Sequence, residues 1–152
     1  MPKDSYYMGI AQAVSLASKD RSRQIGAVVV GPKGEIRSTG YNGFPRGVRD
    51  DVEERHERPM KYLWAEHAER NAVFQAARSG VSIDGCSIFV YTNDLSICAD
   101  CSRSIIQSGI KSVVLPRSVL NHDDLPQWEE SVKQAYIMMY ESGIEIRYWD
   151  GT

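Results

Sequence analysis

Apolar residues follow two different periods in the first part of the chain. Between residues 5 and 19 they recur every three or four positions, which is typical of an amphipathic helix. Residues 25–30 read IGAVVV, a short apolar run that indicates a buried strand, and residues 35–42 read EIRSTGYN, a second strand. The connecting segment GPKGE carries proline and glycine at turn positions, so the two strands are expected to pair as an antiparallel hairpin.

Helical and strand patterns alternate through the rest of the chain, after a polar surface loop at 46–62. The expected elements are a helix at 65–77, a strand at 85–92, a helix at 99–107, a strand at 110–116, a helix at 125–143 and a strand at 144–149. Strands joined through helices make right-handed crossovers, so the last three strands are predicted to be parallel. The pattern therefore predicts an α/β fold, with a three-layer α-β-α arrangement around a five-stranded mixed sheet.

Composition and charge narrow the class of protein. A chain of 152 residues with 42% hydrophobic and 25% charged residues is typical of one compact domain, expected here over residues 1–152. The sequence has neither an N-terminal export pattern nor an apolar run of about 18 residues, so a cytoplasmic protein with no membrane partner is expected. A formal net charge of −2 argues against binding to long nucleic acid. Three cysteines without an export signal favour reduced thiols over a disulfide framework.

Two of these cysteines have the spacing of metal ligands. Cys98 and Cys101 stand three apart at the start of the predicted helix 99–107, so their sulfurs lie on one side of its first turn. The partial positive charge of a helix N-terminus favours the thiolates that a metal ion requires. Such a pair can also be redox-active or incidental, whereas an added imidazole completes a Zn²⁺ site with one position left for water.

His67 and Glu69 open the predicted helix 65–77, whose N-terminal end is expected beside that of helix 99–107. Residues two apart point to nearly opposite sides of a regular helix, so these two can serve one site only at its end. His67 is the expected third zinc ligand. Glu69 indicates chemistry, because a structural zinc site takes a fourth protein ligand and has no use for a free acid. Taken alone, an acid at a helix start could simply interact with the helix dipole.

The segments HAE (67–69) and CADC (98–101) resemble the H-x-E and C-x-x-C motifs of the zinc-dependent cytidine and deoxycytidylate deaminase family. The segments GYNGFPRG, HAERNA and IIQSGIKSVV are similar to its deoxycytidylate branch. The resemblance implies a cytidine deaminase-like fold, one catalytic Zn²⁺ held by His67, Cys98 and Cys101, and hydrolytic deamination of dCMP to dUMP and ammonia. The product would supply thymidylate synthesis. A homo-oligomer, either a dimer or a hexamer, is implied as well.

The same resemblance assigns roles around the base and sugar. Glu69 would take a proton from water and then protonate first the base N3 and later, with the second proton of that water, the leaving amine. The N–H of Ala68 would bind the base O2, and the carbonyl of Ala65 or Glu66 would accept from the amine. Asn42 matches the position that holds the sugar 3′-hydroxyl, but it could equally be a turn residue that tolerates left-handed backbone.

Basic residues near these motifs are the candidates for binding phosphate groups. Arg46 in GYNGFPRG is the first choice for the substrate 5′-phosphate, and Arg23 is the second. The other candidates are Lys19, Arg21 and Arg103. The charged residues at 55–58 could bind a deoxynucleoside triphosphate effector with Mg²⁺, as in allosteric members of the family, although a charge run is usually a solvated face.

Two departures from the family pattern concern the wall of the pocket. Ile97 stands where the family has proline before the first cysteine, and the segment YTNDLSI at 91–97 is longer than usual. Because proline stiffens the backbone, its loss predicts a wider pocket and tolerance of 5-substituted dCMP. The alternatives are deamination of another small base or nucleoside, such as cytidine or guanine, and a non-catalytic, zinc-stabilised binding module.

Overall fold

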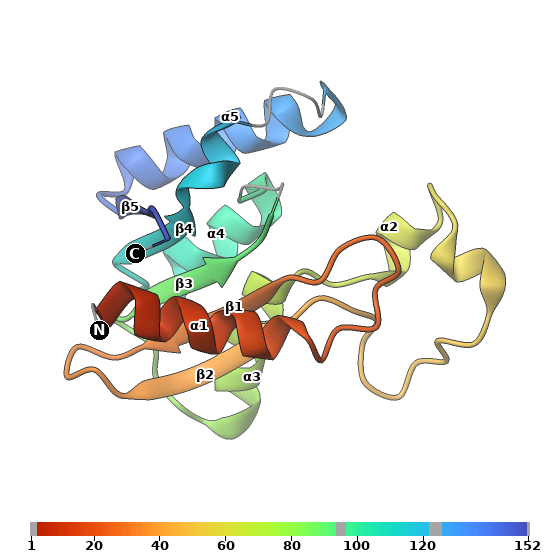
Figure 1. The fold of residues 1–152 in the computed structure, drawn as a ribbon, viewed down its shortest axis with the longest axis horizontal. Helices are drawn as coiled ribbons and strands as arrows, with labels where there is room; N and C mark the ends of the chain where they lie inside the picture. Colours follow the sequence, from red (N-terminus) through yellow and green to blue (C-terminus); the bar gives the residue numbers. More distant parts are fainter. Residues whose placement is uncertain (1–2, 94–96, 122–125, 152) are drawn as a thin grey trace.

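The computed structural model of the chain describes residues 3–93, 97–121 and 126–151. Its helices and strands follow one another in the predicted order (Figure 1). They are α1 Lys3–Ser15, β1 Gly26–Val30, β2 Ile36–Tyr41, η1 Glu53–His56, α2 Lys61–Trp64, α3 Ala68–Ser79, β3 Ser87–Tyr91, α4 Ala99–Gln107, β4 Ser112–Pro116, η2 Arg117–Asn121, α5 Pro126–Glu141 and β5 Glu145–Trp149. None of these helices is long and apolar enough to span a membrane.

The strands form one mixed sheet in the order β2-β1-β3-β4-β5. The strand β1 pairs antiparallel with both β2 and β3, whereas the pairs β3–β4 and β4–β5 are parallel. Each parallel pair is connected along the chain through a helix, α4 in the first case and α5 in the second. The predicted antiparallel hairpin and the three parallel strands at the C-terminal end are confirmed.

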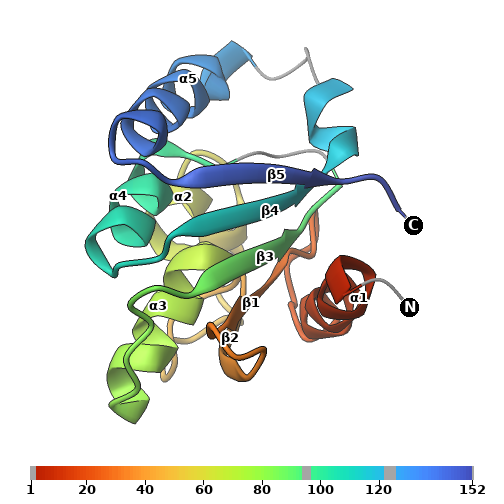
Figure 2. The same ribbon diagram turned by 90° about the vertical axis from the view of Figure 1, so that its left-hand side faces the viewer.

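Helices cover both faces of the sheet, which confirms the three-layer arrangement (Figure 2). The side chains of β1 alternate between two cores: Ala27 and Val29 pack on the side of α3, α4 and α5, and Val28 and Val30 pack on the side of α1. Because both faces of β1 are buried, its sequence is apolar at every position and not at every second one.

The start of α3 differs from the prediction. The helix begins at Ala68 and not at Ala65, because His67 has an extended backbone with φ −82° and ψ 153°. The cause lies in the preceding residue. Glu66 pairs with Gly43 through two backbone hydrogen bonds of 2.8 and 3.1 Å, in an isolated bridge whose extended geometry cannot be part of a helix.

The end of α1 also differs from the prediction. The helix stops at Ser15 and not at residue 19. The next three N–H groups each bond to the carbonyl three residues back, at 3.1–3.2 Å, which tightens the last turn and ends the helix. Ser18 then donates its hydroxyl to the carbonyl of Asn42 at 2.7 Å, so the chain after α1 is joined to the end of β2.

A glycine in β2 allows α3 to lie directly on the sheet. A Cβ atom at Gly40 would stand 2.3 Å from the backbone N of Ala72 and 2.5 Å from the carbonyl O of Ala68. The neighbouring Ser38 hydroxyl donates to the Ala72 carbonyl at 2.6 Å. A side chain at residue 40 would push the two backbones apart, so glycine determines how closely the first turn of α3 approaches the sheet.

The loop between β2 and α3 is long and carries two short helices, η1 and α2. Figure 1 shows it projecting beyond the sheet, on the right of the view. The surface loop predicted at 46–62 is therefore confirmed, and it contains these two short helical segments. Its last residues, after α2, lead directly into His67 and α3.

Candidate metal centre and active site

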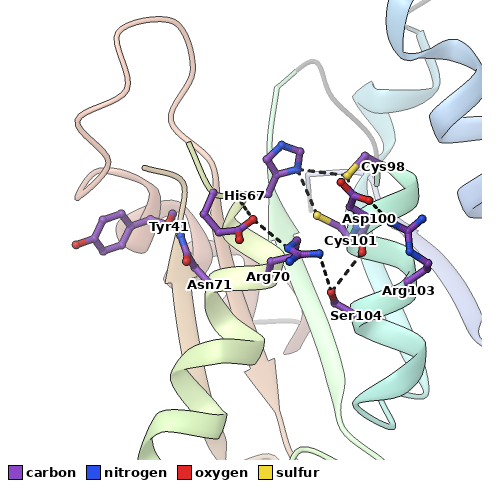
Figure 3. A network of polar contacts seen from close by, with 10 residues as sticks. Tyr41, His67, Arg70, Asn71, Cys98, Asp100, Cys101, Arg103 and Ser104 are labelled. Carbon is purple, nitrogen blue, oxygen red and sulfur yellow. Dashed lines mark hydrogen bonds and ion pairs between the residues drawn. The ribbon is translucent and has the colours of Figure 1, made fainter. Parts of the chain in front are cut away.

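Three side chains with metal-binding atoms meet where α3 and α4 begin (Figure 3). His67 immediately precedes α3, Cys98 immediately precedes α4, and Cys101 lies in the first turn of α4. Figure 3 shows the imidazole directed toward both sulfurs. The structure thus brings together the two helix starts, as the order of the elements predicts.

The distances within this group suit a zinc ion. The Nδ1 atom of His67 lies 3.3 Å from Cys98 Sγ and 3.3 Å from Cys101 Sγ. The three atoms all lie within 4.8 Å of one another. Tetrahedral zinc, with Zn–N bonds of about 2.0–2.1 Å and Zn–S bonds of about 2.3 Å, places a nitrogen and a sulfur ligand roughly 3.5 Å apart. The donor set and its spacing therefore fit Zn²⁺.

Contacts within the group shift the pKa of each member. The hydrogen bond with Cys101, together with His67 and against burial, lowers the pKa of the Cys98 thiol to about 4. The contact with Cys98, against burial, raises the pKa of His67 to about 9. The hydrogen bond to Cys98 and burial raise the pKa of Cys101 well above 9.0. Cys98 is therefore the readiest thiolate, and it also accepts the backbone N–H of Cys101 at 3.4 Å.

Glu69 lies in the first turn of α3 and is only 5% exposed. Burial raises the pKa of its carboxyl, and the positive charge of His67 opposes that effect. His67 and Glu69 line the same pocket, which is possible because His67 stands outside the regular helix. A buried carboxyl with a raised pKa, beside a group that suits a metal ion, holds an accepted proton more readily than a solvated carboxyl and can therefore serve as a proton carrier.

Polar contacts hold the starts of α3 and α4 together. Glu66 Oε1 accepts the N–H of His67 and pairs with Arg70 Nε, both at 3.0 Å. Arg70 in turn donates to the hydroxyl of Ser104 on α4 at 3.4 Å (Figure 3). On the other side of α3, Asn71 Nδ2 donates to the carbonyl of the last residue of β2 at 2.8 Å. The two helices are thereby fixed relative to each other and to the sheet.

A pocket extends from His67, Glu69 and Cys98 along the segment that follows α1 and along α2. Its wall is apolar near Val90 and Ile97 and becomes charged elsewhere. The remaining charged residues on the wall are Asp20, Arg23, Arg58, Lys61 and Glu66. The pocket thus combines an apolar part with a part that carries three cations.

Asn42 lies on this pocket wall at the end of β2 and is 8% exposed. Its Nδ2 donates to the carbonyl of Arg23 at 2.9 Å, and its Oδ1 accepts the N–H of Ile25 at 2.9 Å. No described residue other than glycine has a positive φ, so the interpretation of Asn42 as a left-handed turn residue is wrong. The side chain joins β2 to residues 23–25, and each of its polar atoms can make one further hydrogen bond.

The structure places the two leading phosphate candidates in different surroundings. Arg23 lies on the pocket wall, where its carbonyl meets Asn42. Arg46 is not among the described residues of that wall; it is exposed and donates to Gln75 Oε1 on α3 at 2.6 Å. The other candidates form exposed ion pairs, Lys19 with Asp50, Arg21 with Glu53 and Arg103 with Asp100.

The remaining predicted residues lie close to the metal-binding group. Ala65 lines the pocket, and Ala68 is fully buried as the first residue of α3, where backbone N–H groups have no partner within the helix. Ile97 is fully buried and also lines the pocket. The predicted longer loop before Cys98 includes residues 94–96, which are outside the described residues, so the wider pocket stays a prediction.

Sequence reasoning missed part of the pocket wall. Lys61 and Tyr62 of α2 line it, as does Val132 of α5. Lys61 forms an ion pair at 3.0 Å with Asp20, which also lines the pocket and which sequence reasoning did not single out. No local pattern signals these residues, since they come together only when the loop after β2 folds against the segment after α1.

The site combines an imidazole, two thiols and a buried acid where two helices begin on one face of the sheet. This combination is typical of zinc-dependent hydrolytic enzymes. Residues 1–116 match the model of a family described as the cytidine and deoxycytidylate deaminase zinc-binding region. The chain belongs to this family.

Relatives of known name cover nearly the whole chain. It is 36% identical over 142 residues to a protein of Aliivibrio fischeri named as an uncharacterized deaminase in the luxG 3′ region, covering 93% of this chain and 90% of that protein. It is 36% identical over 147 residues to the deoxycytidylate deaminase of Mus musculus, covering 93% and 76%. The solved dCMP deaminase of cyanophage S-TIM5 shares 28% identity with a TM-score of 0.71 over 96% of both chains, and another structure of that enzyme contains dCMP and dUMP.

Proposed function

We propose that the protein hydrolyses dCMP to dUMP and ammonia, and so provides dUMP for thymidylate synthesis. The observation that carries the proposal is the buried Glu69, which shares a pocket with the His67, Cys98 and Cys101 group. A zinc site that only stabilised a binding module would have no use for an acid held there at the expense of its hydration. The deoxycytidylate deaminases among the relatives support this choice of substrate.

His67, Cys98 and Cys101 are the residues that would hold the zinc ion. When bound, zinc supplies a Lewis acid that makes water a better nucleophile at neutral pH. The pKa of about 4 for Cys98 means that one thiolate is present at neutral pH before any ion enters. The Glu66 carboxylate accepts the backbone N–H of His67 and is itself held by Arg70, so the backbone that carries the imidazole is fixed before a metal ion binds.

Glu69 carries the protons of the reaction. Its carboxylate takes a proton from the water that adds to C4 of the cytosine and delivers it to N3. It then takes the second proton of that water, from the hydroxyl now on C4, and delivers it to the departing amine. The C4–N4 bond breaks, ammonia leaves, and the uracil carbonyl forms. Because burial raises the pKa of Glu69, the protonated carboxyl is stable enough to serve as the acid in the second half of the reaction.

Backbone groups at the start of α3 orient the base. The N–H of Ala68 belongs to the first helical turn and is free of an intrahelical acceptor, so it can bind the base O2. The carbonyl of Glu66 already accepts the N–H of Gly43 at 3.1 Å, which favours the Ala65 carbonyl as the acceptor for the amine. Asn42 has hydrogen-bonding capacity left for the sugar 3′-hydroxyl.

The 5′-phosphate binds at the charged part of the pocket wall. Arg23, Arg58 and Lys61 supply three cations on this wall, and its carboxylates Asp20 and Glu66 pair with Lys61 and Arg70. A phosphate monoester carries roughly −1.5 to −2 charges at pH 7, so it is attracted to these cations. Arg23 therefore replaces Arg46 as the favoured phosphate ligand.

The finer expectations from composition and from the family resemblance belong to the same proposal. They are a homo-oligomer that is a dimer or a hexamer, a single domain over residues 1–152, a deoxynucleoside triphosphate effector with Mg²⁺, and a cytoplasmic location. Light scattering of the purified protein measures the oligomer. Titration of deoxynucleoside triphosphates with and without Mg²⁺ against the initial rate tests for the effector.

The function is tested by ammonia release from dCMP, deoxycytidine and cytidine, with and without a zinc chelator. We expect dCMP to be turned over with the highest kcat/KM, and we expect the chelator to abolish the reaction. The same assay on Glu69→Gln distinguishes the chain's own catalysis from a contaminant. Faster turnover of a nucleoside would assign the protein to the nucleoside deaminases, and no turnover of any substrate by zinc-loaded protein would favour the binding module.

A further inference from the structure

One nearly buried ion pair joins the two walls of the pocket. Residues 20–25 contribute to one wall and residues 58–67 to the other, and these segments are far apart in the sequence. The Nζ atom of Lys61 lies 3.0 Å from the carboxylate of Asp20, and their side chains are 13% and 8% exposed. Neither group has a part in the proton transfers assigned to Glu69.

Asp20 also holds the backbone of the next residues on its side of the pocket. Its Oδ1 accepts the N–H of Ser22 at 2.8 Å and the N–H of Arg23 at 3.0 Å, in addition to its contact with Lys61. Burial would raise the pKa of this carboxyl, but the hydrogen bonds to Arg23, Lys61 and Ser22 outweigh burial and lower it. Asp20 is therefore charged at neutral pH, and it fixes the backbone that carries Arg23.

Two other ion pairs join the segment after α1 to the loop after β2, and both are weaker. Arg21 and Glu53 lie 2.7 Å apart, but their side chains are 57% and 66% exposed. The pair of Lys19 with Asp50, at 3.3 Å, is also exposed. Arg58 also donates to the hydroxyl of Ser22 at 3.4 Å, but this contact is exposed too. Exposed contacts are screened by water and contribute little, so the pair of Asp20 with Lys61 is the strongest of these contacts between the two walls.

The catalytic end of the pocket is held by different contacts. The bridge between Gly43 and Glu66, and the pairing of Glu66 with Arg70, position the start of α3 without any contribution from Asp20. A change at Asp20 should therefore disturb the charged end of the pocket and leave His67 and Glu69 in place.

We propose that Asp20 is a positioning residue that sets the preference for a nucleotide over a nucleoside. Its Oδ1 accepts both the backbone N–H of Arg23 and the ammonium of Lys61, and it thereby holds the two cationic residues close enough to reach the phosphate of one bound substrate. This inference rests on the proposed dCMP deaminase function. It predicts that removal of the negative charge of Asp20 weakens the binding of an anionic substrate. Coulomb repulsion considered by itself predicts the opposite, because a nearby negative charge repels the phosphate.

The test compares the parent enzyme, Asp20→Asn and Glu53→Gln on dCMP and deoxycytidine. Glu53→Gln is the matched control, because it removes a carboxylate that also pairs with the segment after α1, through Arg21, but that does not line the pocket. For Asp20→Asn we expect the KM for dCMP to rise by about tenfold or more while kcat stays within about threefold. The ratio of kcat/KM for dCMP to that for deoxycytidine should fall by a similar factor. Glu53→Gln should match the parent.

An unchanged or lowered KM for dCMP in Asp20→Asn would overturn the inference, and so would equal losses on both substrates, because a merely structural residue lowers both alike. If Asp20→Asn does not fold, Asp20→Ser decides instead, since its hydroxyl can still accept a turn N–H but cannot pair with Lys61. The parent enzyme separates the two claims: a parent without preference for dCMP refutes the proposed function, whereas a preference that survives Asp20→Asn refutes only the role of Asp20.

Discussion

Substitution of Gly40 by alanine tests how the sheet positions the active site. Gly40 lies under the first turn of α3, and its φ is not in the left-handed region, so alanine can adopt the same backbone. The added Cβ atom, however, would stand 2.3 Å from the backbone N of Ala72 and 2.5 Å from the carbonyl O of Ala68. Both are main-chain atoms, which cannot rotate out of the way.

The size of the effect follows from these distances. Ordinary contact for a Cβ atom begins near 3.4 Å, so α3 and β2 must separate locally by about 1.1 Å. Overpacking of this kind destabilises a protein by about 1–3 kcal/mol. The melting temperature should fall by about 2–4 °C for each kcal/mol in a chain of this size. Displacement of a catalytic group by about 1 Å can lower the rate about 10²-fold, and both His67 and Glu69 would move with α3.

The assay measures thermal unfolding, zinc content and kcat for Gly40→Ala beside Gly9→Ala. Gly9 lies inside α1, and a Cβ atom there meets nothing within 4 Å. Gly9→Ala should therefore stabilise the protein by about 0.5–1 kcal/mol and leave kcat unchanged. Gly40→Ala should melt earlier, retain zinc less tightly and turn over dCMP more slowly.

A Gly40→Ala protein with the melting temperature and kcat of the parent would refute the reasoning. It would mean that α3 does not depend on close contact with β2 for its position. A loss of stability without a loss of kcat would refute the second half, the claim that the height of α3 above the sheet determines the geometry of His67 and Glu69.

Four further outcomes are expected. Glu69→Gln should retain zinc and fold but lose at least about 10²–10⁴-fold in kcat, and a variant within tenfold of the parent would require another proton carrier. After the zinc is removed by a chelator, iodoacetamide at pH 7 should label Cys98 before Cys101 and Cys86, because the pKa of Cys98 is about 4 and those of the other two thiols are raised. Mass spectrometry measures the order of labelling, and equal labelling of the three would contradict this expectation. The pKa of Asp20 in the folded protein lies below its ordinary value of 3.8. The charged Asp20 therefore stabilises the fold above pH 3.8, and this stabilisation is lost as the pH falls through the folded-state pKa. Urea unfolding between about pH 3 and pH 7 should therefore show a smaller acid loss for Asp20→Asn than for the parent. Finally, 5-methyl-dCMP should be discriminated against by less than the roughly 10–200-fold typical of one methyl group in a tightly fitted pocket, as kcat/KM measures.

The sequence alone determined the order of the elements, the antiparallel hairpin and the parallel direction of the last three strands, because these follow from local patterns. The run IGAVVV signals a buried strand, the turn GPKGE signals a hairpin, and strands separated by helices signal parallel pairing; the antiparallel pairing of β1 with β3 appears only in the structure. The H-x-E and C-x-x-C spacings pointed to His67, Glu69, Cys98 and Cys101 for a related reason: chemistry at a helix start requires particular residues at short, fixed intervals.

Tertiary structure alone decided what happens between segments distant in the chain. His67 and Glu69 line one pocket because the bridge between Glu66 and Gly43 delays the start of α3. Arg23 lies on the pocket wall and Arg46 does not, although both are equally basic in the sequence. The pairing of Asp20 with Lys61 joins residues 41 positions apart, which no local pattern encodes. Such contacts depend on how the helices pack on the sheet and how the loop after β2 folds back. Burial strengthens these ion pairs and hydrogen bonds, and burial exists only in the folded chain.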